Sequence, residues 1–426
     1  MKKVIVIGGG IAGISAASYL DGNNFEITLI ESSPHLGGRV KSFYDDDFKS
    51  YLDNGQHLLI RGYESTLDLI RKFKADDNFI FQKEFTINFR DRINQEWYLK
   101  ISTPITTLFN FLRFKNLNFR ERISLLNFFS RLKNADDFTT DLTVLDFLRK
   151  CNQDEKVINN FWKLIVESAL NTQIEKSSAS VFLFVLKKMF VENKSNSSFV
   201  IPKKSLYESL IIPAENYLNE KGVSVIKSCG VERILIDDDY ITAVVDRSGK
   251  TYKADYYILA VHPAVVNKLI PQIDFQLDYQ SIINLHLKIS YQRFENKFFA
   301  LWDSKVHWAF FHKNHITLIK SSADELLKYS NEEILQIFID ELIQFFPELR
   351  NELTRIKLTK QDYRLIKEKR STFLSDLNSI KERPQLKTRF KNLFLAGDYV
   401  NTGYPSTIES AVLSGKMVAE EIHKIN

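Results

Sequence analysis

The first 31 residues alternate between short apolar runs and a segment with helical character. Residues 4–7 form an apolar run rich in β-branched side chains, which is typical of a buried parallel strand. Residues 14–20 have helical character, and residues 25–30 form a second apolar run. A strand, a helix and another strand in this order predict the first unit of a Rossmann-like α/β sheet.

Strand and helix patterns continue along the chain. Further strands are predicted at residues 223–226, 231–236, 241–245, 256–261 and 392–395, and a β-rich region with a turn near Lys313 and Asn314 at 281–320. Helices are predicted across 105–186, 205–220, 330–347 and 407–423, and each of the last three begins at residues with capping-box spacing. Residues 192–198 are expected to form an exposed loop.

This alternation at both ends and in the middle of the chain predicts two interleaved domains. We expect a discontinuous nucleotide-binding domain built from residues 1–75, 199–270 and 385–426. An inserted α+β substrate domain would comprise residues 76–198 and 271–384.

The turn after the first strand contains a glycine pattern with a known physical role. Gly8, Gly10 and Gly13 follow the Gly-x-Gly-x-x-Gly spacing, with Ala12 inside it, and Glu31 ends the second strand 18 residues after Gly13. Glycines permit a tight turn and close approach to a diphosphate, which the helix N-terminus attracts, and the acid binds the ribose hydroxyls. The full unit predicts a dinucleotide site, and the acid favours FAD or NAD over NADP.

Composition narrows the class of protein. The chain has 426 residues and is 44% hydrophobic and 26% charged, which is typical of a globular protein. Its net charge of +5 is small for this length, so we expect no nucleic-acid partner. Neither a targeting segment nor a run of about 18 apolar residues is evident, so we expect a cytoplasmic protein. Cys151 and Cys229 lie too far apart to suggest a disulfide framework or a zinc site.

Three histidines invite a metal-site interpretation. His307, His312 and His315 fall in the β-rich region. Neighbouring positions on a strand alternate between faces, so His307 and His312 are expected to point in opposite directions. No accompanying carboxylate pattern is present, and we therefore predict that the protein holds no metal.

Residues 99–133 combine basic and apolar side chains with a single acid, Glu121. One interpretation is an amphipathic helical pair of the second domain with a solvated basic face. The other is a helical region that rests on anionic lipid, with Lys and Arg at the headgroups and Phe and Leu below them. We favour the lipid interpretation, which would bring the protein to the inner face of the cytoplasmic membrane.

Several short motifs occur in a fixed order along the chain. They are the opening glycine fingerprint, Gly37-Gly38-Arg39, Cys229-Gly230-Val231-Glu232-Arg233-Ile234, Ala254-Asp255-Tyr256-Tyr257-Ile258-Leu259-Ala260 and Leu395-Ala396-Gly397-Asp398. Together they resemble the superfamily of flavin-containing amine oxidases and phytoene desaturases, over nearly the whole chain. The resemblance implies a Rossmann-like FAD-binding domain of the amine oxidase type with an inserted substrate domain.

Longer runs resemble a narrower group within that superfamily. They are Asp53-Asn54-Gly55-Gln56-His57-Leu58-Leu59, Ala169-Leu170-Asn171-Thr172 and Ala396-Gly397-Asp398-Tyr399-Val400 with Tyr404-Pro405-Ser406-Thr407-Ile408-Glu409. These runs are similar to those of the hydroxysqualene dehydroxylase family. The resemblance implies an FAD-dependent oxidoreductase of squalene and hopanoid biosynthesis that reductively dehydroxylates hydroxysqualene, a long isoprenoid lipid, in an apolar tunnel over the flavin.

The same resemblance implies roles for individual residues in holding FAD. The cofactor-binding residues it implies are Gly8, Gly10, Ala12, Gly13, Glu31, Gly38, Arg39, Gly55, Gln56, Val231, Gly397, Asp398, Thr407 and Ile408. The glycine loop and Arg39 would meet the diphosphate, Val231 the adenine, and Asp398 the ribityl chain or the diphosphate. The N–H groups of Thr407 and Ile408 would face the flavin edge that becomes negative on reduction.

His57 and Asp53 are the candidate catalytic residues, because His and Asp commonly move protons. Each also has a structural alternative, as a hydrogen-bonded histidine and as a residue that caps the turn at Asn54. Other activities on the same scaffold are carotenoid-type desaturation or isomerisation, or amine oxidation, and a non-enzymatic prenyl-binding protein is the different-class alternative. The sequence identifies no electron donor.

Overall fold

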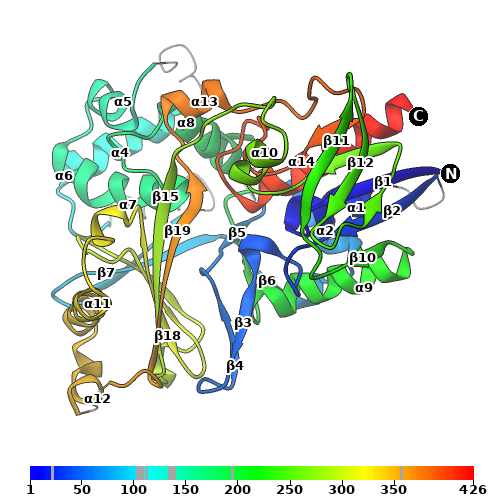
Figure 1. Ribbon diagram of the computed structural model, residues 1–426. Coiled ribbons are helices and arrows are strands. Elements are labelled where there is room, and N and C mark those ends of the chain that lie inside the picture. The colour runs from blue at the N-terminus through cyan, green and yellow to red at the C-terminus, as the bar shows by residue number, and fades with distance from the viewer. Residues whose placement is uncertain (21–23, 102–109, 111–113, 133–140, 193–195, 356–357) are drawn as a thin grey trace.

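The computed structural model describes the whole chain except residues 21–23, 102–109, 111–113, 133–140, 193–195 and 356–357. Two sheets lie side by side in Figure 1. A parallel sheet near both chain termini stands on the right, and a larger mixed sheet stands on the left. The long strands β15 (Tyr279–Leu287) and β19 (Tyr363–Phe373) run between the two parts.

The parallel sheet has five strands in the order β10-β2-β1-β14-β20, and every neighbouring pair is parallel. The strands are β1 (Lys2–Ile7), β2 (Phe25–Ile30), β10 (Ser224–Ile226), β14 (Tyr256–Leu259) and β20 (Leu393–Leu395). They come from three distant parts of the chain. This arrangement confirms the predicted Rossmann-like α/β fold class, while the exact domain boundaries stay predictions.

Both faces of the parallel sheet are buried, which explains its continuous apolar runs. Val4 and Val6 of β1 pack into the core formed with α1 (Ile11–Tyr19), α9 (Ile212–Glu220) and α14 (Ile408–Ile425). Ile5 and Ile7 point to the other face. That face is covered by α10 (Pro263–Leu269) and the antiparallel strands β11 (Val231–Asp237), β12 (Tyr240–Asp246) and β13 (Thr251–Tyr252).

The larger sheet has seven strands in the order β19-β15-β18-β17-β16-β7-β8. Besides β15 and β19 they are β7 (Phe85–Arg90), β8 (Glu96–Ile101), β16 (Phe298–Leu301), β17 (Trp308–Phe311) and β18 (Ile316–Ser321). Only the β16–β7 pair is parallel among the described strands of this sheet. The turn between β17 and β18 contains Lys313 and Asn314, so the predicted β-rich region and its turn are confirmed.

Helices pack against this sheet from two sides. On one side Phe338 and Leu342 of α11 join the core with Ile283 and Leu285 of β15. On the other side, a helical cluster shares a core with Trp308. The helices are α11 (Asn331–Phe345), α12 (Arg350–Arg355), α4 (Phe119–Arg131), α5 (Val144–Lys150), α6 (Glu155–Val157), α7 (Lys163–Leu170) and α8 (Ala179–Lys187).

Smaller elements connect the two parts. They are the hairpin of β3 (Ser42–Asp45) and β4 (Ser50–Asp53), the sheet of β5 (Leu59–Ile60), β6 (Phe79–Phe81) and β9 (Phe199–Pro202), and the helices α2 (Glu64–Lys72) and α13 (Leu377–Glu382). Short 3₁₀ turns and π turns complete the fold, among them η1 (Gly38–Val40) and η7 (Tyr207–Ile211). The hairpin projects downward in Figure 1.

Two helix starts follow the predicted capping chemistry. The Ser330 side chain accepts from the N–H of Glu333, whose carboxylate accepts from the Ser330 N–H, which is a complete capping box. Ser205 likewise accepts from the N–H of Glu208, at a distance of 3.2 Å. The helix behind Ser205 begins with the π turn η7 and continues as α9, which ends at Glu220 as predicted.

Two sequence expectations need correction. The region 99–133 does not begin as a helix: Leu99 lies buried in β8, and Phe114 and Phe128 are core residues. Residues 102–109, 111–113 and 133 of that region lie outside the described residues. In the polar run 192–198, Ser197 and Ser198 are buried rather than exposed, because the backbone carbonyls of residues 196 and 198 accept hydrogen bonds from Gly62 and Arg61. No helix among the described residues is long and apolar enough to cross a membrane.

Candidate functional site

The glycine loop after β1 is held tightly between neighbouring strands. The Gly8 N–H donates to the Ile30 carbonyl at 2.8 Å, and Gly8 has a φ of +109° that disfavours any side chain. A Cβ on Gly8 would lie 2.3 Å from the Ala260 carbonyl oxygen, and one on Gly13 would lie 2.0 Å from the Gly8 carbonyl oxygen. The sequence therefore needs glycine at both positions to bring β1, α1 and β14 together.

The N-terminus of α1 is open toward a second glycine turn. Gly10 is its N-cap, and no side chain caps the first N–H groups. Gly37 donates from its N–H to the Gly9 carbonyl at 2.8 Å, and the one described atom that a Cβ on Gly10 would meet is the Gly38 Cα, at 4.0 Å. Uncapped N–H groups with the positive end of the helix dipole form an anion site, and the facing glycines leave room for a diphosphate.

Glu31 lies at the carboxyl end of β2, beside this loop. Its carboxylate accepts from the Gly9 N–H at 2.6 Å and from the Ser33 N–H at 2.7 Å. The Glu31 carbonyl accepts from the Cys229 N–H at 2.8 Å, so the chain leading to Val231 runs beside it. Glu31 and Val231 thus lie on the same side of the glycine loop, and their roles toward ribose and adenine stay predictions.

Arg39 and Asp398 form an ion pair across the opposite side of the loop. Arg39 Nη1 donates to Asp398 Oδ2 at 3.0 Å and to the Ser371 carbonyl at 3.0 Å, while Nη2 bonds the other carboxylate oxygen. The Asp398 side chain is 5% exposed and that of Arg39 is 39% exposed, so the guanidinium borders open space and the carboxylate lies behind it. Burial alone would raise the pKa of Asp398, but Arg39 and the Ser406 hydroxyl lower it below its usual value.

The loop between Asp398 and α14 is held by a buried arginine. Arg383 donates to four carbonyls of this loop, those of Asp398, Tyr399, Val400 and Tyr404. Burial lowers the pKa of Arg383 to about 10, so it stays charged at neutral pH. Its guanidinium fixes the loop in one shape, because the planar fork satisfies several carbonyls at once.

The start of α14 differs from the predicted capping box. Thr407 is the N-cap, and its hydroxyl accepts from the Ser410 N–H at 3.2 Å. The Ser406 hydroxyl instead donates to Asp398. Glu409 does not complete a capping box with its own helix either. Its buried carboxylate accepts hydrogen bonds from the N–H groups of Ser65 and Thr66 and thereby caps α2. The N–H groups ahead of Ser410 have no partner within the helix, as the predicted roles of Thr407 and Ile408 require.

The segment 53–57 joins the two parts of the molecule. Asn284 of β15 donates from Nδ2 to the Asn54 carbonyl at 2.9 Å, and Asn54 donates from its own Nδ2 to Glu368 of β19 at 2.9 Å. Gly55 and Gln56 follow directly and are half-buried. A Cβ on Gly55 would lie 3.6 Å from Asn284 Nδ2, so Gly55 lies against the large sheet.

The two candidate catalytic residues have different surroundings. The Asp53 carboxylate accepts from the Ser42 hydroxyl at 2.6 Å and from the Leu206 N–H at 3.0 Å, so it anchors the start of η7 rather than the turn at Asn54. Burial raises its pKa to about 6. His57 is half-buried, and burial together with the charge of Arg39 lowers its pKa to about 4. Its imidazole is therefore neutral at physiological pH.

Comparison with known proteins places this geometry in a family. The family model described as flavin containing amine oxidoreductase matches residues 11–423. The chain belongs to the flavin-containing amine oxidoreductase family. It is 27% identical over 431 residues to hydroxysqualene dehydroxylase of Zymomonas mobilis subsp. mobilis, covering 99% of both chains.

Two further comparisons extend the list of similar proteins. The chain is 22% identical over 457 residues to the chloroplastic/chromoplastic 15-cis-phytoene desaturase of Arabidopsis thaliana, covering 99% of this chain and 80% of that protein. The crystal structure of an oxidoreductase from Methanosarcina mazei superposes with a TM-score of 0.76 at 15% identity, covering 98% of this chain and 100% of that one. The latter similarity establishes the fold.

The family member is thus an FAD-dependent oxidoreductase, and its residues fit the cofactor. The open N-terminus of α1 suits the diphosphate, and Glu31 and Asp398 flank the loop on its two sides. Arg383 and Ser406 are residues that sequence reasoning missed. Ser406 stands three residues before Glu409, which is the spacing of a local helix cap, and Arg383 stands before Pro384 outside any periodic pattern, so the sequence gives no signal for their contacts with the Asp398 loop.

The three histidines considered for a metal lie in two separate places. His307 contacts Glu167 at 3.3 Å and Lys320 at 3.1 Å, and all three side chains are buried. His312 and His315 instead stack, with ring centroids 4.2 Å apart. In the part of the chain that the structure describes, no cluster of three or more His, Cys, Asp or Glu could hold a metal ion.

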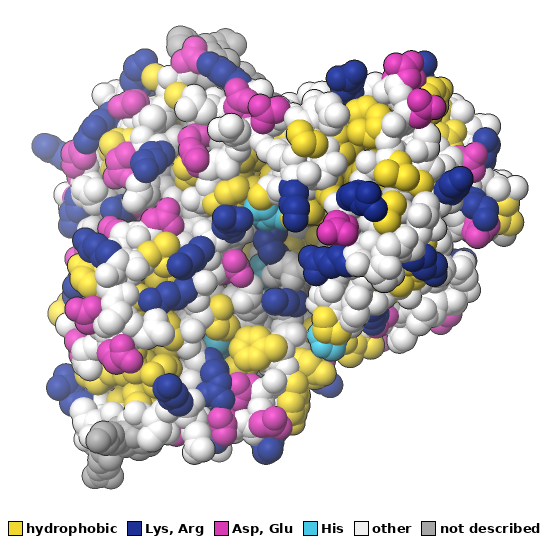
Figure 2. All heavy atoms as spheres, viewed as in Figure 1, with side chains coloured by type: hydrophobic (Ala, Val, Ile, Leu, Met, Phe, Trp, Pro, Cys, Tyr) yellow, Lys and Arg dark blue, Asp and Glu magenta, His cyan; other side chains and the backbone are white. Residues whose placement is uncertain are grey.

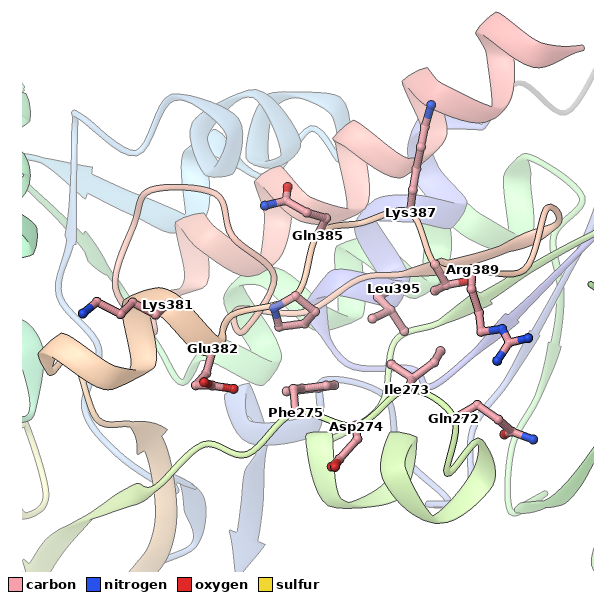
Figure 3. A pocket seen from close by; sticks show the side chains of 12 residues that line it. Gln272, Ile273, Asp274, Phe275, Lys381, Glu382, Gln385, Lys387, Arg389 and Leu395 are labelled. Carbon is pink, nitrogen blue, oxygen red and sulfur yellow. The ribbon is translucent and has the colours of Figure 1, made fainter.

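A pocket of about 290 Å³ lies away from the glycine loop, between α13 and the segment 272–275 (Figure 3). Gln272, Asp274, Glu382 and Arg389 contribute polar groups to it. A second pocket of about 250 Å³ is lined by the charged residues around Glu167. Neither is the predicted apolar tunnel. Figure 2 shows a hollow between the two parts of the molecule in which Lys, Arg and His side chains gather.

Proposed function

We propose that this flavoenzyme removes the hydroxyl group of hydroxysqualene reductively and releases squalene and water. The observation that carries the proposal is the full-length similarity to a hydroxysqualene dehydroxylase, which covers 99% of both chains. The overall change breaks a C–O bond, forms a C–H bond, and consumes two electrons and two protons. A two-electron donor that reduces the flavin must therefore act with this protein.

The residues of the site divide the work between binding and proton transfer. When bound and reduced, FAD supplies a hydride equivalent. The open end of α1 and Arg39 hold the diphosphate, and the first turn of α14 stabilises negative charge at the flavin edge. We propose that one of two residues, His57 or Asp53, places a proton near the departing hydroxyl. Asp53, whose pKa is about 6, holds a proton more readily than His57 near neutral pH.

Desaturation of a carotenoid-type polyene is the second candidate function. The similarity to 15-cis-phytoene desaturase over 99% of this chain favours it over amine oxidation, which rests on the family alone. A prenyl-binding protein without redox activity is the least supported alternative, because Glu31 and Asp398 remain in place to bind the cofactor.

A substrate panel separates these functions. Oxidised protein is mixed without oxygen with phytoene or with an amine, and dithionite-reduced protein is mixed with hydroxysqualene, each lipid dispersed in detergent. The proposal predicts that only hydroxysqualene changes the flavin spectrum, with squalene as the product. Flavin reduction by phytoene or by the amine would assign the corresponding alternative, and no change with any compound would favour the binding protein.

We also propose that the protein contacts the membrane surface through the β7–β8 turn and through residues 115–120 at the start of α4. Ile93 is 70% exposed and Phe119 is 69% exposed. Asn116 donates to Asp91 at 2.8 Å, which joins the two segments, and Lys115 and Arg120 are exposed beside Phe119. Exposed apolar side chains flanked by cations fit an anionic lipid surface.

Sedimentation with anionic liposomes tests this contact. Ile93→Ser combined with Phe119→Ser should reduce the bound fraction, whereas the control Ile80→Ser, at a position 47% exposed elsewhere, should not. Equal binding of all three proteins would contradict the proposed contact.

A further inference from the structure

Two aromatic side chains that the described site does not use lie next to the glycine loop. His262 follows the carboxyl end of β14 and caps α10, and Tyr279 is the first residue of β15. Their rings stack with centroids 4.7 Å apart and an interplanar angle of 28°. The stack therefore joins the edge of the parallel sheet to the start of the large sheet.

The protonation of His262 follows from its contacts. Its Nδ1 accepts a hydrogen bond from the Ala264 N–H at 3.2 Å, because that N–H lies in the first turn of α10. Since Nδ1 is the acceptor, a neutral imidazole carries its proton on Nε2. Burial and the charge of Arg39 lower the pKa of His262 to about 4, so the neutral form prevails at physiological pH.

Both polar ends of this pair are buried without a partner in the described part of the chain. The atoms are His262 Nε2 and Tyr279 Oη. Leaving a buried donor unpaired costs free energy, on the order of 1–3 kcal/mol for each group. Because the two donors sit on stacked rings, an acceptor from one bound ligand would satisfy both.

The sheet order identifies that ligand's position. Glu31 follows β2, the glycine loop follows β1, His262 follows β14 and Asp398 follows β20, and these strands are neighbours in that order. The Ala260 carbonyl, two residues before His262, is the group that leaves no room for a Cβ on Gly8. Tyr279 pairs with Phe373, close to the Ser371 carbonyl that holds Arg39.

We propose that His262 Nε2 and Tyr279 Oη bind the flavin-side phosphate of FAD as two neutral hydrogen-bond donors. If FAD extends from Glu31 to Asp398, the part that links its adenosine and flavin halves lies at the carboxyl end of β14. Its diphosphate offers the strong anionic acceptors there, beside Arg39. The inference depends on bound FAD and is independent of the lipid substrate.

FAD release from the purified holoprotein tests the proposal. Tyr279→Phe removes only the hydroxyl and keeps the stack, while His262→Asn keeps an acceptor for the Ala264 N–H and removes the Nε2 donor. Each variant should release FAD about tenfold faster on dilution, followed as the rise in flavin fluorescence, because a hydrogen bond to a charged group is lost. Tyr98→Phe, at an exposed position on β8, is the matched control and should release FAD at the wild-type rate.

Phosphorus NMR of the same holoproteins locates the contact. Each variant should shift the flavin-side phosphorus resonance more than the adenosine-side one, the reverse order would contradict the proposal, and the control should shift neither. The proposal is overturned if both variants release FAD at the wild-type rate, or if release accelerates while both phosphorus resonances stay unmoved. The second result would place the donors on the ribityl chain or the flavin instead.

Discussion

Arg39 and Asp398 lie 359 residues apart in the sequence, and the Arg39 guanidinium donates to both carboxylate oxygens of Asp398. The pair joins the second glycine turn to the loop that follows β20. Its guanidinium faces the open side and its carboxylate the buried side, and we expect the flavin half of the cofactor to lie beside this pair.

Replacing Asp398 should release the flavin. Asp398→Ala leaves Arg39 without its buried partner and frees the Ser406 hydroxyl, so the loop before α14 loses its anchor. The purified variant should be nearly colourless, measured as the ratio of flavin absorbance to protein absorbance. Asp255→Ala, at the amino end of the same sheet, is the control and should keep its flavin. A yellow Asp398→Ala protein would contradict the assigned role.

The position of Glu31 leads to a prediction for the adenosine end of the cofactor. Glu31→Ala should weaken FAD binding about 10- to 100-fold, because hydrogen bonds to a charged group contribute about 1.5–3 kcal/mol. Titration of FAD into the flavin-depleted protein measures this change. Glu26→Ala removes an exposed carboxylate from the same strand and should bind FAD like the wild type. Equal affinities for the two variants would place the ribose away from Glu31.

Arg383 should matter for folding as well as for the flavin. Arg383→Met leaves four loop carbonyls without their donor, so several kcal/mol of the free energy of unfolding should be lost. Denaturant unfolding measures the loss. Arg389→Met, at the rim of the pocket in Figure 3, should change stability by much less. A wild-type stability for Arg383→Met would show that water replaces the guanidinium.

The fold could be predicted from the sequence where local pattern and tertiary position agree. The apolar run at residues 4–7 is buried on both sheet faces. Gly8 and Gly13 must be glycine, because a Cβ at either position would clash with a backbone carbonyl oxygen. Ser197 illustrates the opposite case. This polar residue is expected to be exposed, yet it is buried where the backbone N–H groups of Arg61 and Gly62 bond to the carbonyls on either side of it, and no side-chain pattern reveals such pairing.

The site was predictable only in part. Spacing identifies the glycine loop and Glu31, because one supersecondary unit contains them all. Ser406 and Glu409 have the spacing of a local cap, but each is recruited by a distant element, Asp398 and the start of α2 respectively. Long-range hydrogen bonds of this kind depend on tertiary contacts, which local spacing does not encode.

Histidines whose pKa is lowered by burial predict acid lability. The pKa of His312 is lowered to about 4 by burial, from 6.5 in the unfolded chain. Between these values the unfolded chain binds more protons, so the stability present above pH 6.5 is lost as the pH falls toward 4. Asp53, with a raised pKa of about 6, acts in the opposite direction.

A single variant isolates this effect. His312→Phe keeps the stack on His315 and removes one titrating group. The decline of the free energy of unfolding between pH 6.5 and 5 should become shallower by up to about 1.4 kcal/mol per pH unit, the effect of one proton. Denaturant unfolding at several pH values measures the slope, and identical slopes for variant and wild type would refute the prediction.

The most direct test of the whole account is a single turnover without oxygen. Holoprotein reduced stoichiometrically by dithionite is mixed with hydroxysqualene in detergent, and flavin absorbance near 450 nm and extracted lipids are followed together. We predict that one squalene forms for each flavin reoxidised. Flavin that stays reduced while hydroxysqualene is recovered unchanged would contradict the proposed function.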